Sequence, residues 1–263
     1  MLDQESGLRF GVFALVLTIM ALWETLAPWR SDPARRARWP GNIGLAVLGA
    51  ALIRVTQPLA PLSAAIAAQA NGWGLFHWFD VPSLAATILA VVLLDLVIYA
   101  QHRLFHVWPA AWPIHRVHHA DTTMDVTTGL RFHPIEIVIS LVVKTGAVFA
   151  LGASPAAVMI FEIALNATAM FNHANVRLPH AIDNVLRWLI VTPAMHRVHH
   201  SVVRTETDSN FGFNIPWWDR LFGTYQATPT GGEDGVAIGL ADFRGEAERG
   251  LVRLLTHPFR GSH

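Results

Sequence analysis

The amino-acid sequence predicts an all-α fold: a polytopic membrane helical bundle of about four to five spans, with a cytoplasmic helical cap that carries short histidine motifs, the histidine boxes. Hydrophobic residues make up 52% of the 263 residues and charged residues only 14%, and the mean hydropathy is +0.37. This balance is too apolar for an ordinary soluble domain and is typical of a membrane protein. Several apolar runs also approach the roughly 20 residues that a helix needs to cross a bilayer.

Charge and cysteine content exclude several classes of protein. The formal net charge is zero and the pI is about 7.3, so the chain lacks the basic surface expected of a protein that binds nucleic acid. The sequence contains no cysteine. Disulfides, cysteine-ligated zinc, iron–sulfur clusters and thiolate catalysis within the chain are therefore excluded.

The first apolar run, residues 10–27, is predicted to span the membrane. A signal peptide is the alternative, but no small-residue cleavage site is present and the basic residues follow the run. These basic residues are Arg30, Arg35, Arg36 and Arg38. By the positive-inside rule, they place the N-terminus outside and the arginine cluster in the cytoplasm.

The next two runs are predicted to bring the chain out and back. Residues 43–70 are apolar but interrupted, so we expect one span in their first part and a short outer segment after it. Arg54 is expected to reach an interface or to face the protein interior. Residues 82–100 form the third run, with Pro82 suited to a helix start, and they lead directly into a histidine motif.

The second half of the chain contains an apolar hairpin and a polar end. Residues 135–151 and 155–170 are expected to cross the membrane outward and back. Residues 177–191 are predicted to lie along the membrane interface. After residue 201 the chain becomes more polar, and we expect a cap followed by a loose tail in which His257 and His263 are surface residues.

Histidines are concentrated in three motifs. HRVHH occurs at residues 115–119 and again at residues 196–200, and an HxxxH motif comprises His102 and His106. Positions i, i+3 and i+4 share one face of a helix, so each motif can direct its imidazoles toward one place. Imidazole is a good ligand for zinc, copper, iron and nickel. Eight imidazoles are too many for one tetrahedral zinc ion and suit two ions of higher coordination number.

Polar residues on the predicted spans are candidates for supporting the metal ligands. Asp95 and Tyr99 lie on one helical stripe with the HxxxH motif. An acid within an apolar helix is often functional, and Asp95 is expected to accept a hydrogen bond from a ligand imidazole and so fix its tautomer. The alternative is a structural ion pair between Asp95 and Arg54 or Arg103.

A similar stripe joins Glu162 and Asn166 to His173, which becomes a candidate ninth ligand. The alternative for His173 is a structural role at a helix end. The positive-inside rule and the number of spans make no use of the histidines. Both nevertheless bring the HxxxH motif, the two HRVHH motifs and His173 to the same side of the membrane, as a metal site requires.

These motifs resemble the fatty acid hydroxylase / sterol desaturase superfamily over residues 95–225. The resemblance rests on Asp95, Tyr99, His102, Arg103 and His106, on both HRVHH motifs, on Arg131-Phe132-His133-Pro134-Ile135-Glu136, on Asn210-Phe211-Gly212 and on residues 218–225. Members of this superfamily are integral-membrane non-haem di-iron enzymes. The resemblance therefore implies two Fe ions, O2 as co-substrate and a lipid-like substrate.

The resemblance also implies a set of metal ligands. These are His102, His106, His115, His118, His119, His173, His196, His199 and His200. A tenth ligand would be His133, His180 or water. Asp95, Tyr99, Glu162 and Asn166 would surround the ligands. The expected domains are residues 1–94 as an N-terminal transmembrane region, residues 95–225 as the histidine-box domain with its transmembrane hairpin, and residues 226–263 as a C-terminal tail.

The function implied is hydroxylation or desaturation of a fatty acyl, sterol, ether-lipid or carotenoid substrate. No flavin or haem domain is recognisable, so electrons would come from a separate donor such as a cytochrome b5-like protein, a ferredoxin or a reductase. A membrane zinc hydrolase is one alternative, but it would use a carboxylate base that the boxes lack. A metal transporter is another, but its ligands would be distributed through the membrane depth.

Overall fold

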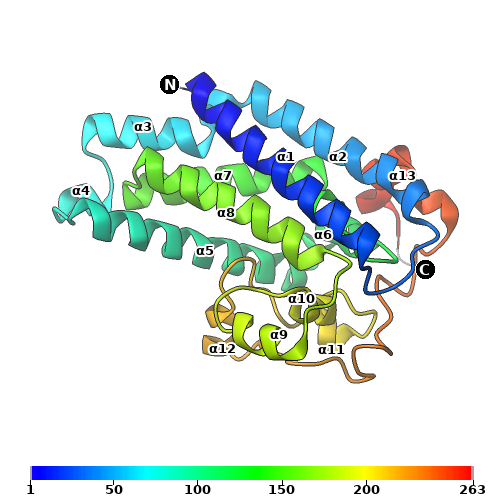
Figure 1. Ribbon diagram of the computed structural model, residues 1–263. Coiled ribbons are helices and arrows are strands. Elements are labelled where there is room, and N and C mark those ends of the chain that lie inside the picture. Colours follow the sequence, from blue (N-terminus) through cyan, green and yellow to red (C-terminus); the bar gives the residue numbers. More distant parts are fainter. Residues whose placement is uncertain (1, 262–263) are drawn as a thin grey trace.

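Long helices that run side by side form the body of the protein (Figure 1). The structure, a computed structural model, describes residues 2–261. Its long helices are α1 (Leu2–Leu26), α2 (Arg35–Val55), α5 (Ser83–Val107), α7 (Pro134–Leu151) and α8 (Pro155–His173). The shorter helices are α3 (Pro61–Asn71), α4 (Leu75–Trp78), α6 (Trp112–His119), α9 (His180–Leu186), α10 (Pro193–His199), α11 (Arg204–Thr207), α12 (Trp217–Leu221) and α13 (Leu251–Thr256). Between residues 2 and 261 there is no strand, only two isolated bridges, so the predicted all-α fold is confirmed.

Four helices are long and apolar enough to cross a membrane. They comprise residues Gly7–Leu26 of α1 and the whole of α5, α7 and α8. The stretch predicted at residues 43–70 differs in detail, because α2 begins earlier, at Arg35, and includes several arginines. In Figure 1, α2 and α3 follow one another along the bundle, antiparallel to α1. Arg54 bonds to Gln57 at an exposed position. The chain is thus a polytopic helical bundle, as predicted.

The turn between α7 and α8 has the residues that such a hairpin needs. Gly152 ends α7 with a φ of 69°, a left-handed conformation that glycine adopts at little cost. Ser154 accepts a hydrogen bond from the backbone N–H of Ala157, and Pro155 occupies the first turn of α8. A β-carbon on Gly74 would lie 2.1 Å from the Gly152 nitrogen, so the loop before α4 packs directly on this hairpin.

The up-and-down order of the helices collects the histidine motifs at one end of the bundle. The C-terminal ends of α1, α5 and α8 and the N-terminal ends of α2 and α7 meet there, together with α6 and α10 (Figure 1). The α3–α4 connection and the α7–α8 turn lie at the opposite end. Between α8 and the C-terminal region, the short helices α9 to α12 form the cap.

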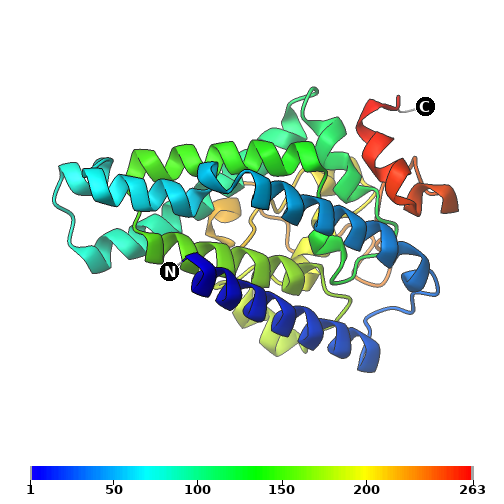
Figure 2. The ribbon, with the colours of Figure 1, turned by 90° about the horizontal axis from the view of Figure 1, so that it is seen from above.

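The C-terminal segment is not the loose tail that the sequence predicted. Helix α13 packs on the start of α2, far from α4 (Figure 2). Leu254 is fully buried in a cluster with Leu45 and Val117, and Val117 belongs to the first HRVHH motif. His257, expected at the surface, is fully buried. Arg116 of the same motif donates hydrogen bonds to the carbonyls of His257 and Arg260. His263 lies outside the described residues.

Candidate metal centre

All nine histidines proposed from the sequence as ligands lie in two compact groups. The first group contains His102, His106, His115, His119 and His199, and the second contains His118, His173, His196 and His200. Within each group, one ring nitrogen from each residue lies within 4.8 Å of the others. None of the nine residues is more than 3% exposed. The other two histidines considered lie outside both groups: His133 caps α7, and His180 is exposed at the start of α9.

Each HRVHH motif divides its imidazoles between the two groups, which corrects the prediction that one motif serves one place. His115 and His119 belong to the first group, whereas His118 belongs to the second. Successive residues of a helix point about 100° apart, so adjacent histidines face different directions. The second motif does the reverse, because only His199 joins the first group. The rings of His119 and His200 stack with centroids 4.4 Å apart, which places the groups side by side.

Facing ring nitrogens within each group are close together. In the first group, His102 Nε2 lies 3.1 Å from His115 Nε2 and 3.0 Å from His199 Nε2. In the second group, the Nε2–Nε2 distances are 3.0 Å for His173–His118 and 2.9 Å for His173–His196. Two nitrogens about 2.1 Å from one cation lie about 3.0 Å apart at a right angle and about 3.4 Å apart at the tetrahedral angle. Distances of about 3 Å are therefore of the size expected for neighbouring ligands of one cation.

Hydrogen bonds at Nδ1 fix the direction of the free lone pairs. His102 Nδ1 lies 2.8 Å from the Phe211 carbonyl, and His199 Nδ1 lies 2.7 Å from the Ser209 carbonyl. Carbonyl oxygens only accept, so both rings carry their proton on Nδ1. The two Nε2 atoms then face one another with lone pairs and no proton between them. A cation bound between the two nitrogens would accept both lone pairs, so the residues present fit a metal ion.

Three further imidazoles have comparable partners. His173 Nδ1 donates to the Ala169 carbonyl, 2.6 Å away. His115 Nδ1 lies 2.8 Å from Glu136 Oε1, and His106 Nδ1 lies 3.4 Å from Asp208 Oδ1. Such partners orient a ligand ring and raise its basicity. The sequence did not indicate Asp208, and Glu136 entered only as the last residue of the Arg131–Glu136 motif that carries the family resemblance. The pairing with His115 depends on how α7 docks against α6.

None of the four residues expected to surround the ligands forms a hydrogen bond or ion pair with one of the nine histidines. Asp95 Oδ2 accepts hydrogen bonds from Trp218 Nε1, at 2.8 Å, and from the backbone N–H of Ile215. It therefore holds the cap against α5 and pairs with neither an imidazole nor an arginine. Tyr99 bonds to Thr224. The shared helical stripe predicted the correct face of α5. It did not predict how far along the helix the metal site extends, because the stripe is longer than the site.

The other two expected residues lie farther along the bundle. Glu162 forms ion pairs with Arg9, at 2.6 Å, and Lys144, at 3.1 Å. The Asn166 side chain donates to the Glu162 carbonyl one turn earlier in α8. These interactions join α1, α7 and α8, so both residues support the packing of the bundle.

Phe211, which follows the second HRVHH motif, forms an aromatic wall beside the first histidine group. Phe211 lies edge-on to His102, His106 and His199, with ring centroids 5.1–5.8 Å away. Asp219 holds the Phe211 segment, because its carboxylate accepts hydrogen bonds from the backbone N–H groups of Phe211 and Gly212, both at 2.8 Å. The wall excludes water from the ring nitrogens.

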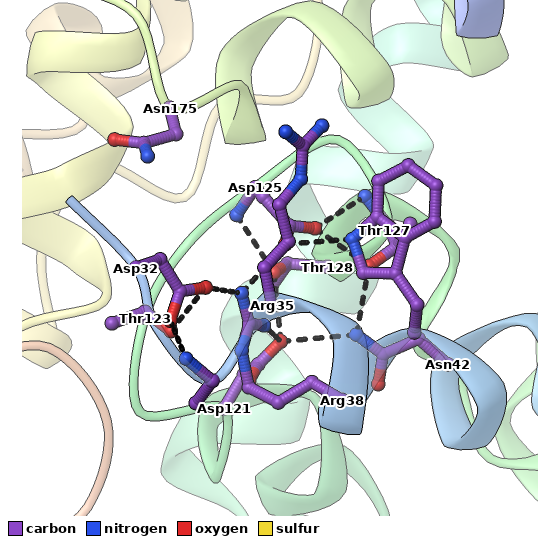
Figure 3. Close-up of polar contacts among 12 residues, drawn as sticks. Asp32, Arg35, Arg38, Asn42, Asp121, Thr123, Asp125, Thr127, Thr128 and Asn175 are labelled. Carbon is purple, nitrogen blue, oxygen red and sulfur yellow. Dashed lines mark hydrogen bonds and ion pairs between the residues drawn. The ribbon is translucent and has the colours of Figure 1, made fainter. Parts of the chain in front are cut away.

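The loop after the first HRVHH motif is held by a buried arginine from α2 (Figure 3). Arg38 is 1% exposed and pairs with Asp121 at 2.7 Å, with Asp125 at 2.6 Å and with Asp32. Asn42, one turn later, donates to Asp121. Burial alone would raise the pKa of Asp121, but Arg38 and Arg131 hold it below its usual value. This cluster connects the N-terminal region to the histidine boxes and was not predicted.

Burial keeps the imidazoles of the boxes neutral, which is the form that binds metal. Burial and the neighbouring histidines lower the pKa of His119 and His200 well below the usual 6.5. Burial likewise lowers the pKa of His199 to about 3. The groups therefore present uncharged nitrogen ligands at neutral pH.

The fold and this centre define a membrane helical bundle with a buried, all-histidine site for metal. A family model, fatty acid hydroxylase, matches residues 87–224, just over half of the chain. The chain belongs to this family, which is known for iron-dependent oxygenation. The resemblance noted from the motifs is thereby confirmed.

Comparison with curated proteins gives relatives that act on lipids. The chain is 28% identical over 261 residues to ornithine lipid hydroxylase OlsE of Rhizobium tropici, covering 94% of this chain and 74% of the relative. It is 27% identical over 226 residues to alkylglycerol monooxygenase of Xenopus tropicalis, covering 84% and 47%. It is 30% identical over 158 residues to very-long-chain aldehyde decarbonylase GL1-1 of Oryza sativa subsp. indica, covering 57% and 25%. No solved structure matches. These relatives are consistent with a membrane oxidoreductase that acts on lipids.

Proposed function

We propose that the protein is a membrane non-haem di-iron oxidoreductase that uses O2 to hydroxylate a lipid. The observation that carries this proposal is the pair of buried, all-histidine groups that lie side by side, with ring nitrogens facing one another about 3 Å apart. Two adjacent sites favour two ions over one. The family's iron-dependent oxygenation favours iron as the metal.

The nine histidines have distinct tasks in this proposal. Five imidazoles would hold one iron and four would hold the other. When bound, the iron pair supplies the redox chemistry that oxidises an unactivated C–H bond with O2. Glu136 keeps His115 in one tautomer, and the carbonyls of Phe211 and Ser209 do the same for His102 and His199.

We favour hydroxylation over desaturation because of how much of this chain each relative matches. The two proteins that match the larger parts of this chain are named a lipid hydroxylase and a monooxygenase. The decarbonylase matches 57% of the chain and only 25% of its own length. A substrate with a hydrocarbon chain would enter from the bilayer, since helices apolar enough to cross it lead to the histidine groups.

The orientation and the electron source are also part of the proposal. The arginines after the first span favour a cytoplasmic location for the histidine groups and an outside location for the N-terminus. Two electrons per turnover would come from a separate cytochrome b5-like, ferredoxin or reductase partner, because hydroxylation by O2 reduces the second oxygen atom to water.

A zinc hydrolase fits the geometry less well. Among the described residues, both groups consist of histidine alone. The nearby carboxylates, Glu136 and Asp208, face Nδ1 atoms of ligand candidates and so are engaged as their partners. Neither is placed as a free base for activating water.

The proposal is tested by product analysis in cells that carry the gene and a reductase system. Lipids extracted after growth under ¹⁸O2 should contain a species with one labelled hydroxyl group. His118→Ala and His199→Ala, one from each group, should abolish this species while the protein still inserts in the membrane. Label incorporation that is unchanged in both variants would refute the proposal.

A further inference from the structure

The cap carries an exposed apolar surface that no part of the described chain covers. Its residues are 46% to 68% exposed. We call it the α9–α12 surface, and it comprises Val185, Trp188, Leu189, Trp217, Leu221 and Phe222. Large exposed apolar surfaces mark contacts with proteins or membranes.

Hydrogen bonds and ring contacts join α12 to the segment that follows α9, so the exposed side chains form one surface. Trp217 Nε1 donates a hydrogen bond to the Trp188 carbonyl, 2.7 Å away. The Arg220 guanidinium lies 3.7 Å from the Trp188 ring and 3.9 Å from the Tyr225 ring. Arg220 also donates to the Arg187 carbonyl at 3.0 Å. Both arginines are only partly exposed.

The position of α12 along α5 sets the depth of this surface. Trp218 of α12 is bonded to Asp95, the middle residue of the 25-residue helix α5. At 1.5 Å per residue, Asp95 lies about 18 Å from either end of that helix. The hydrocarbon core of a bilayer is about 30 Å thick. A helix that crosses it therefore places its middle residue well inside the core.

A second contact extends along the same face of α5. Phe222 stacks on Tyr99, one turn nearer the histidine end, with ring centroids 5.5 Å apart. In Figures 1 and 2, α12 lies beside the middle of α5 rather than beyond its end, and Figure 1 places α9 next to α12. The cap is thus attached to the flank of the bundle.

We propose that the α9–α12 surface is embedded in the acyl-chain region of the leaflet on the histidine side. Lipid is the fitting partner, because a soluble protein would have to reach below the headgroups to contact α12. The inference depends on the depth of α5 and not on the chemistry of the metal centre.

This placement brings lipid chains close to the first histidine group. Phe222 stacks on Tyr99, Tyr99 meets Phe211 edge-on with centroids 6.3 Å apart, and Phe211 lies against His102. The embedded surface therefore borders the aromatic wall of the candidate metal centre. A lipid substrate has only to move laterally along it.

The test uses the absence of cysteine in the native chain, since a single introduced cysteine is then the only labelling site. Spin labels are attached to Val185→Cys and Leu221→Cys in the full chain, reconstituted in lipid nanodiscs. Collision with O2, which partitions into bilayers, is compared with collision with a water-soluble nickel chelate. Val142→Cys on the exposed face of α7 serves as the lipid control, and Glu246→Cys, 91% exposed at its side chain, serves as the water control.

Labels at positions 185 and 221 should behave like the label at position 142, with frequent O2 collisions and few nickel collisions. Nickel collisions as frequent as those at position 246 would overturn the proposal, because the surface would then lie in water. Few collisions with either reagent would overturn it in favour of a protein contact, such as a second copy of the chain.

Discussion

Removal of the carboxylate of Glu136 should weaken metal binding without displacing a ligand. Glu136 Oε1 lies 2.8 Å from His115 Nδ1, the Glu136 side chain is 6% exposed, and no other described carboxylate replaces it at that ring. Loss of such a ligand partner typically weakens metal affinity by about 10- to 100-fold. Because tenfold corresponds to about 1.4 kcal/mol, Glu136→Ala should cost roughly 1.4–2.8 kcal/mol of binding free energy.

The glutamine variant gives an intermediate expectation. Its amide oxygen can still accept the Nδ1–H bond, but the charge is lost. Hydrogen bonds to charged groups are stronger than neutral ones by about 1 kcal/mol, so Glu136→Gln should bind metal about fivefold more weakly than the wild type. The binding assay is a competitive titration of the metal-free protein in detergent, without oxygen, with Fe(II) and a chelator of known affinity.

The matched control is Glu162→Gln. Glu162 is an equally buried glutamate in a neighbouring helix, but it pairs with Arg9 and Lys144 rather than with a histidine. Its Fe(II) affinity should equal that of the wild type. The reasoning is refuted by a Glu136→Ala variant that keeps full affinity, or by equal weakening in both glutamine variants.

Three more predictions concern other parts of the molecule. Arg38→Met leaves buried carboxylates such as Asp121 unpaired, so we expect a loss of about 3–5 kcal/mol in stability, seen as a lower apparent Tm; an unchanged Tm would contradict this. His118→Ala and His199→Ala should each impair one group, so elemental analysis should give less metal per chain for both; full metal content in either would argue against that ligand. Burial lowers the pKa of His257 in the folded protein to about 3. In the unfolded chain a histidine has a pKa of about 6.5, so only the unfolded chain takes up this proton between these values. The free energy of unfolding therefore falls as the pH drops below about 6.5. His257→Phe should therefore lose less Tm between about pH 7 and pH 5 than the wild type, and equal losses would contradict the buried neutral state.

The sequence predicted the bundle well, because apolar runs long enough to cross a bilayer report directly on contact with lipid. The hairpin of α7 and α8 follows from two apolar segments and the Gly152–Pro155 turn. The convergence of the histidine motifs at one end followed from counting spans. The second stretch was harder to interpret, since Arg38, near the start of α2, is buried by ion pairs that no local pattern reveals.

The candidate site was predicted in its members but not in its arrangement. The spacing of the motifs identified eight of the histidines and a helical stripe added His173. Spacing nevertheless assigned His118 and His119 to one place, where helix geometry separates adjacent side chains. Asp95 was expected at an imidazole because it shares a stripe with His102, but it lies two turns away and binds Trp218. The partners found instead, Glu136 and Asp208, depend on packing between helices that are distant in the sequence. His257 was missed for the same reason.

Metal analysis of the purified wild-type protein tests the central claim most directly. Elemental analysis would be combined with Mössbauer spectra of protein produced with iron-57. The account predicts about two irons per chain, antiferromagnetically coupled in the oxidised form, as two adjacent histidine groups imply. One or two zinc ions per chain, with no uptake of Fe(II) on anaerobic reconstitution, would contradict it.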